Sequence, residues 1–144
     1  MAIAYPNPSF KFGCEDIELG YRLSKHSPFN VIFNKNAISY TIRKISFEDF
    51  CTRMFKQGES SYKFLAMHNH NEIYEWVDAT ALEDHYFKIV KRYPLIIEST
   101  RKFDRLVRDK ILEKFDVRSD TKLLYKMYAL AFKSAKSFGF MSGR

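Results

Sequence analysis

The segment around residues 46–65 constrains the fold most, because its apolar and small residues recur at the spacing of an α-helix. A stripe of this period places one face of a helix against a core. Ser46, with Asp49 three residues later, resembles a capping box and predicts that the helix begins here. The residues of the stripe are Phe47, Phe50, Cys51, Met54, Phe55, Gly58 and Tyr62.

A second two-faced pattern covers residues 120–137. Its apolar side has two interpretations: a stripe facing the core with a solvated lysine face opposite, or a helix lying on an anionic membrane surface or a phosphate. Further helices are predicted over 15–25, 79–92 and 95–114, the last two separated at Pro94. The apolar side holds Leu124, Met127, Tyr128, Ala131, Ala135 and Phe138, and the basic side holds Lys122, Lys126, Lys133 and Lys136.

Two short runs rich in β-branched and aromatic residues predict strands at 29–34 and 37–42, joined by a turn. The predicted fold class is therefore mainly α with a short two-stranded β element. The composition changes near residue 66, which we take as an internal boundary.

The positive charge of the chain is concentrated in its C-terminal third. The net charge is +7, and residues 91–144 carry 14 lysines and arginines against 6 acids, whereas residues 1–90 carry 10 against 11. Such a surface attracts phosphates, acidic lipid headgroups or nucleic acid. No nucleic-acid-binding motif accompanies it, so we expect no specific nucleic-acid partner.

The two cysteines, Cys14 and Cys51, have no Cys-x-x-Cys spacing and do not cluster with histidines at metal-ligand spacing. This predicts free thiols in a reducing compartment and no metal site. The chain has neither a signal-peptide pattern at its start nor a run of about 18 apolar residues. We therefore expect a cytoplasmic protein.

Three carboxylates, Glu15, Asp16 and Glu18, follow Gly13 at the start of the helix expected over 15–25. Acidic residues at a helix N-terminus are favoured by the helix dipole, by about 0.3–1 kcal/mol each. A carboxylate held beside a glycine turn can also act as a general base toward a hydroxyl group. The spacing alone leaves both interpretations open.

The order of three segments resembles the second half of the catalytic domain of family 2 glycosyltransferases, the inverting enzymes of GT-A fold. The segments are "FGCEDIELGYRL", "FNVIFNKNAISY" and "SFEDFCTRMFKQGESS", and the resemblance covers about residues 10–64. It implies that residues 1–66 form the acceptor-side half of a GT-A (α/β) domain, with residues 67–144 as a basic helical extension. The implied function is transfer of a sugar from a nucleotide sugar to a hydroxyl acceptor, with inversion.

The resemblance also implies roles for particular residues. Asp16 would be the catalytic base that takes the proton of the acceptor hydroxyl, and Glu15 would help to position the acceptor. Arg53 and Gln57, four residues apart on one helix face, would border the acceptor and the diphosphate, although a solvated helix edge explains them equally well. Arg43 could meet a phosphate.

The sequence departs from the family at two places. The stretch "YTIRK" replaces a histidine-containing segment of many relatives, and neither an Asp-x-Asp motif nor a glycine-rich phosphate loop occurs. Intact relatives would use a divalent metal, Mg²⁺ or Mn²⁺, whereas we expect no cofactor in this chain. We accordingly expect a truncated, inactive piece of a glycosyltransferase that associates into a homo-oligomer. The alternative is a non-enzymatic helical module that docks on an anionic membrane surface, as a peripheral contact, or on a partner protein.

Overall fold

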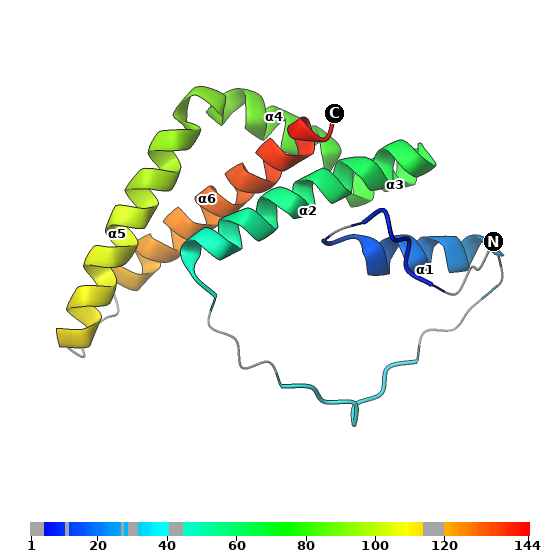
Figure 1. Cartoon of the computed structure of the whole chain (residues 1–144), viewed down its shortest axis with the longest axis horizontal. Coiled ribbons are helices and arrows are strands. Elements are labelled where there is room, and N and C mark those ends of the chain that lie inside the picture. Colours follow the sequence, from blue (N-terminus) through cyan, green and yellow to red (C-terminus); the bar gives the residue numbers. More distant parts are fainter. Residues whose placement is uncertain (1–4, 11, 27, 29–31, 41–44, 114–119) are drawn as a thin grey trace.

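The computed structural model describes residues 5–10, 12–26, 28, 32–40, 45–113 and 120–144, and these form a helical protein (Figure 1). The helices expected from the sequence are confirmed, although the break expected at Pro94 lies at residues 90–92, and a short helix, α3, is added where none was predicted. The elements are α1 (Glu15–His26), α2 (Phe47–His68), α3 (Asn71–Trp76), α4 (Ala79–Ile89), the 3₁₀ turn η1 (Val90–Arg92), α5 (Tyr93–Glu113) and α6 (Asp120–Ser142).

Helix α6 lies at the centre and packs against α2, α4 and α5. It runs beside α2 in the same direction, as Figure 1 shows. The Phe47 ring stacks on Tyr128 near the start of both helices, with centroids 5.6 Å apart, and Tyr62 meets Phe140 near their ends at 5.5 Å.

The apolar stripe predicted on α6 faces this core. Leu124, Ala131 and Ala135 are buried. Lys122, Lys126 and Lys133 are exposed as predicted, but Lys136 is half-buried. The prediction of a core-facing stripe is therefore confirmed, and Lys136 departs from the solvated lysine face.

Helix α1 packs against the C-terminal half of α2 and against α3. The ring of Tyr21 meets Phe64 edge-on at 5.8 Å and Trp76 at 5.9 Å. Phe10, Cys14 and Ile73 belong to the same buried cluster. Helix α2 continues without a break through residue 66, and the division of the chain at that residue stays a prediction.

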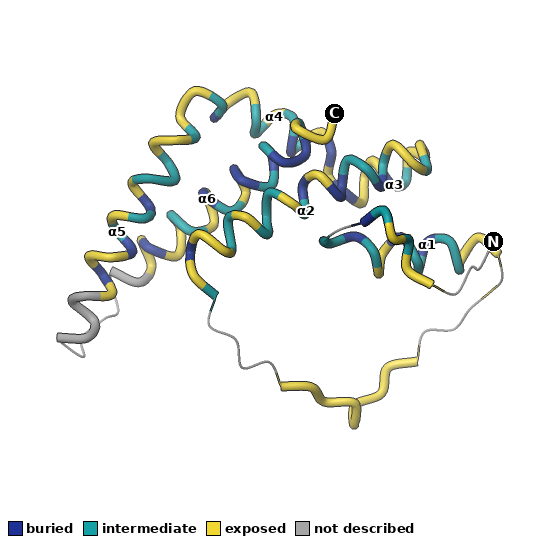
Figure 2. The backbone as a smooth tube through the Cα atoms, viewed as in Figure 1, coloured by how far each residue is buried: buried dark blue, intermediate teal, exposed yellow. Residues whose placement is uncertain are grey.

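The predicted two-stranded β element is wrong: no strand occurs in the part of the chain that the structure describes. The predicted turn does form, since the Ala37 amide donates to the Asn34 carbonyl at 3.1 Å. The described residues on either side, within 32–40, form no strand pairing and are exposed (Figure 2), with Phe33 90% and Tyr40 87% accessible.

The physical reason is that a strand needs hydrogen-bond partners from another segment, and a lone hairpin is marginal in water. A turn, by contrast, forms from local chemistry alone. Residues 29–31 and 41–42 of the predicted strands lie outside the described residues. The described chain is therefore all-helical, without the α/β character expected from a GT-A half.

Candidate functional site

A left-handed turn places the acidic pair at the start of α1. Gly13 has φ 78° and Cys14 has φ 65°, a conformation that is uncommon for a residue other than glycine. The Cys14 carbonyl accepts from the Glu18 amide at 2.8 Å, which closes the first turn of the helix. The turn is held on α2 by Ser60, whose hydroxyl donates to the Phe12 carbonyl at 2.6 Å.

The two carboxylates predicted to act on an acceptor differ in their surroundings. Asp16 is exposed, and its Oδ1 accepts from the Ile17 amide at 2.9 Å. Glu15 is half-buried, and its Oε2 is enclosed without a hydrogen-bond partner among the described residues. A buried carboxylate oxygen without a partner is costly, whereas the free N–H groups of the helix N-terminus favour both charges.

The structure brings Arg53 and Gln57 to the turn that precedes these acids. The Arg53 guanidinium lies over the Phe12 ring, 5.6 Å from its centroid. A Cβ atom built on Gly13 would lie 3.3 Å from Cγ of Gln57, so the turn rests directly on this side chain. No carboxylate in the described ranges pairs with Arg53 within ion-pair distance. The fifth predicted site residue, Arg43, lies outside the described residues.

A cavity of about 200 Å³ lies beside the start of α1, where Cys14 and Ile17 line it but Glu15 and Asp16 do not. Trp76 is 59% exposed, so the cavity opens to solvent beside its indole ring. The walls are mostly apolar, with a few polar groups, as in many small-ligand sites. The lining residues are Cys14, Ile17, Gln57, Ser61, Phe64, Trp76, Val77 and Lys136.

Of these residues, only Gln57 was predicted from the sequence as a site residue, and Lys136 and Trp76 are among those that were missed. The spacing of Lys136 matches that of the exposed lysines of α6, and Trp76 lies between the helices predicted to end near residue 65 and to begin near residue 79. Only the packing of α6 and α3 against α2 brings them to the cavity, and no local signal marks either residue as a site residue.

The Cys14 thiol lines the cavity but is not activated. Its Sγ is 3.6 Å from the Ser61 hydroxyl. Burial raises the pKa of the Cys14 thiol, and the Ser61 hydrogen bond and the nearby Lys136 ammonium oppose this shift only in part. Because the thiolate is the nucleophilic form, Cys14 does not have the character of a catalytic nucleophile at neutral pH.

A second hollow, of about 430 Å³, adjoins the Phe12 ring. Two lysines line it, and the Lys63 ammonium donates to the Ser9 carbonyl at 2.7 Å. Glu59 offsets part of this charge. The lining residues are Ser9, Phe12, Lys56, Glu59, Ser60 and Lys63.

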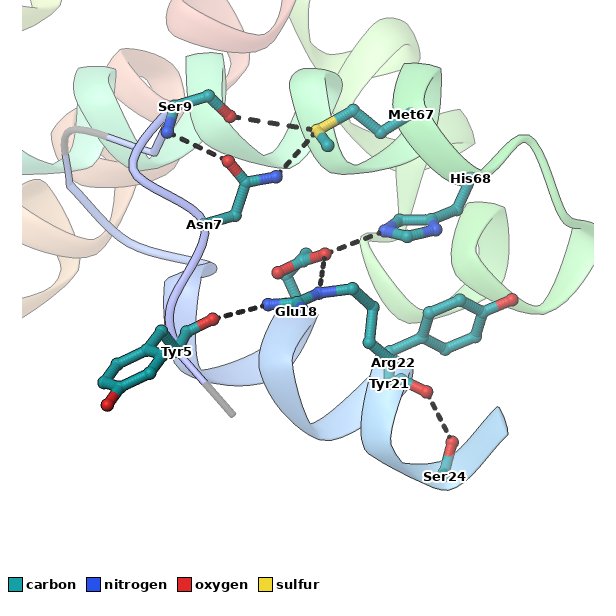
Figure 3. A network of polar contacts seen from close by, with 9 residues as sticks. All are labelled: Tyr5, Asn7, Ser9, Glu18, Tyr21, Arg22, Ser24, Met67 and His68. Carbon is teal, nitrogen blue, oxygen red and sulfur yellow. Dashed lines mark hydrogen bonds and ion pairs between the residues drawn. The ribbon is translucent and has the colours of Figure 1, made fainter. Parts of the chain in front are cut away.

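Glu18, the third acid of the cluster, is buried and connects α1 to the end of α2 (Figure 3). Arg22 donates through Nε to its Oε1 at 2.7 Å, and His68 Nε2 lies 3.2 Å from the same oxygen. Arg22 also donates to the Tyr5 carbonyl at 2.8 Å. These contacts give Glu18 a structural position, different from that of exposed Asp16.

Within the described residues, no group of three or more His, Cys, Asp or Glu side chains is arranged to hold a metal ion. None of the helices that the structure describes combines the length and apolarity required to cross a membrane. No protein-family model, curated protein or solved structure matches this chain. The resemblance to family 2 glycosyltransferases therefore stays a prediction made from the sequence.

Proposed function

We propose that this chain supplies the acceptor side of an inverting glycosyl transfer from a nucleotide sugar to a hydroxyl group. One observation carries the proposal: exposed Asp16 lies in the chain between Cys14 and Ile17, and these two residues line the cavity together with Gln57, although Asp16 itself does not. The proposal therefore places the acceptor hydroxyl at the edge of this cavity, within reach of the exposed Asp16 carboxylate outside it.

In the proposed step, the Asp16 carboxylate takes the proton of the acceptor hydroxyl as that oxygen attacks the anomeric carbon of the donor. A new carbon–oxygen bond forms on the opposite face from the bond that breaks, so the configuration inverts. The bonding electrons leave with the nucleoside diphosphate. Arg53, which has no acidic partner in the described chain, is the cation on this side of the turn that suits a phosphate.

In intact relatives an Asp-x-Asp motif would hold the divalent metal, and this motif does not occur in the sequence. The free thiols of Cys14 and Cys51 suit the reducing cytoplasm, and we place the protein there.

The cavity also suggests the class of acceptor. A volume of about 200 Å³ suits one sugar ring rather than a long chain. The Trp76 indole offers a flat apolar face for the C–H groups of the ring, and the Lys136 ammonium offers a partner for an anionic substituent. The proposed acceptor is a sugar that carries a phosphate or a carboxylate.

The sole tryptophan of the chain makes this testable by intrinsic fluorescence. We would titrate the full chain with glucose, N-acetylglucosamine and their 6-phosphates. We expect saturable changes in emission with at least one sugar phosphate, and weaker binding by Gln57→Ala and Lys136→Ala. Lys133→Ala is the matched control, because this exposed lysine lies on the same helix and away from the cavity lining.

Absence of a saturable change with all four compounds would count against an acceptor site in this cavity. Equal binding by Lys136→Ala and the unsubstituted chain would remove the role proposed for this lysine. Because no donor-binding motif occurs in the sequence, we expect no transfer when a nucleotide sugar and Mn²⁺ are added to the chain alone.

A further inference from the structure

The corner between α4 and α5 exposes apolar and basic side chains together. We define the elbow surface as the exposed side chains of Phe87, Lys88, Lys91, Arg92 and Leu95. They lie at the end of α4, on η1 and at the start of α5, where the chain turns at the outer corner of the helical bundle (Figure 1). Figure 2 shows that much of this corner is exposed.

The elbow is anchored firmly from the inside. Tyr86 and Tyr93 both pack on Phe138 of α6, with ring centroids 4.9 and 4.1 Å away, and Ile89 is buried. Phe87 and Leu95 nevertheless stay 66% and 67% exposed. Their exposure therefore does not come from a frayed helix end, since their immediate neighbours are packed.

Among the described residues, the three cations of the elbow surface have no acidic partner. No ion pair of Lys88, Lys91 or Arg92 occurs in the part of the chain that the structure describes. The sequence has no Asp or Glu from 85 to 97. The next part of α5 is different, because Arg101 pairs there with Glu48 at 2.9 Å and with Glu98 at 2.6 Å.

We propose that the elbow surface is a contact site for an anionic lipid bilayer. Phe87 and Leu95 would enter the interface between headgroups and acyl chains, while Lys88, Lys91 and Arg92 would meet the lipid phosphates. Apolar side chains projecting among unpaired cations complement a surface that is anionic outside and apolar beneath. The phosphates of a nucleic acid would attract the three cations but would leave Phe87 and Leu95 exposed to water. An anionic lipid bilayer can interact with both kinds of side chain and is therefore the better fit.

This proposal does not depend on glycosyl transfer, because it concerns a different surface and is measured without any sugar. The full chain would be sedimented with vesicles of phosphatidylcholine mixed with phosphatidylglycerol, and with vesicles of phosphatidylcholine alone. We expect binding to the anionic vesicles only, weakening as salt is raised.

Two variants test the basic and the apolar side chains of the elbow surface separately. Lys88→Glu with Lys91→Glu and Arg92→Glu should reduce the partition coefficient by about tenfold or more, because each cation near the bilayer contributes to the attraction. Phe87→Ser with Leu95→Ser should reduce it by a similar factor without changing the net charge. Circular dichroism and the melting temperature would verify that both variants fold.

Helix α6 offers matched controls. Lys122→Glu with Lys126→Glu and Lys133→Glu changes the net charge by the same amount, and Leu123→Ser with Tyr125→Ser removes two exposed apolar side chains. We expect these controls to bind vesicles nearly as well as the unsubstituted chain. Equal losses of vesicle binding in the α6 variants and the elbow variants would overturn the proposal, because binding would then depend on overall charge or apolarity and not on the elbow surface. Binding to duplex DNA with no binding to anionic vesicles would overturn it as well.

Discussion

Gly58 of α2 and Gly139 of α6 allow the two helices to touch backbone to backbone. A Cβ atom on Gly58 would lie 2.0 Å from the Lys136 carbonyl oxygen, and one on Gly139 would lie 1.8 Å from the Phe55 carbonyl oxygen. Both distances are far below a van der Waals contact, and the obstructing atoms belong to the main chain. The close approach of α2 and α6, which brings Lys136 to the cavity beside Cys14, therefore depends on both glycines.

We predict that Gly58→Ala and Gly139→Ala each destabilise the protein. Alanine favours a helix over glycine by about 1 kcal/mol, but forcing α2 and α6 apart costs about 1–3 kcal/mol or more in lost packing. The net loss should appear as a lower midpoint in urea unfolding. Gly20→Ala in α1 is the matched control, because nothing lies within 4 Å of its added Cβ. That variant should be as stable as the unsubstituted chain or more so, and a loss equal to that of Gly58→Ala would show that helix contact is not the cause.

We predict that Asp16→Asn separates catalysis from stability. The measurement requires an intact enzyme in which this segment is joined to a nucleotide-sugar-binding half. In that enzyme, loss of the general base should lower the turnover rate by about 10²–10⁴-fold. The unfolding midpoint should change little, because asparagine can still accept a hydrogen bond at the helix start. Asp49→Asn is the control, since Asp49 is an exposed acid in the first turn of α2. Equal turnover by the two variants would mean that Asp16 is not a catalytic base and that the acidic pair only stabilises the N-terminus of α1.

Glu18→Gln should act in the opposite way and reduce stability. The neutral amide loses the charged interaction with Arg22 and alters the contact with His68, and a hydrogen bond to a charged group is worth about 1.5–3 kcal/mol. The melting temperature should therefore fall. Glu72→Gln, which removes only the solvent-exposed pair with Lys25, should have a smaller effect. A Glu18→Gln variant as stable as Glu72→Gln would show that the buried contacts contribute nothing measurable.

We predict that the chain self-associates through residues 32–40. These residues expose large apolar side chains and main-chain groups that can pair with another extended segment. Light scattering should report a mass above that of the 17.1 kDa chain, rising with concentration. Phe33→Ser with Tyr40→Ser should shift the protein toward a monomer, whereas Leu123→Ser with Tyr125→Ser should not. A monomer at every concentration would refute this prediction.

The sequence alone determined where most helices lie, because helix formation is local. The Ser46 cap was predicted from its spacing to Asp49, and the structure confirms it: the Asp49 amide donates to Oγ of Ser46 at 3.0 Å. The apolar stripe of α6 was readable in the same way, since residues three and four apart share a helix face. The same spacing placed Arg53 and Gln57 on one side of α2.

Only the tertiary structure decided which faces meet. The approach of Gly58 to α6, and the placement of Trp76 and Lys136 at the cavity, depend on contacts between segments far apart in the chain. The predicted strands failed for the same reason: their turn formed at Asn34 from neighbouring residues, but strand hydrogen bonds need a partner that no described segment provides. The local sequence pattern specifies a helix and its apolar face. A binding site or a β-sheet also requires a second segment of the chain to pack or pair with the first.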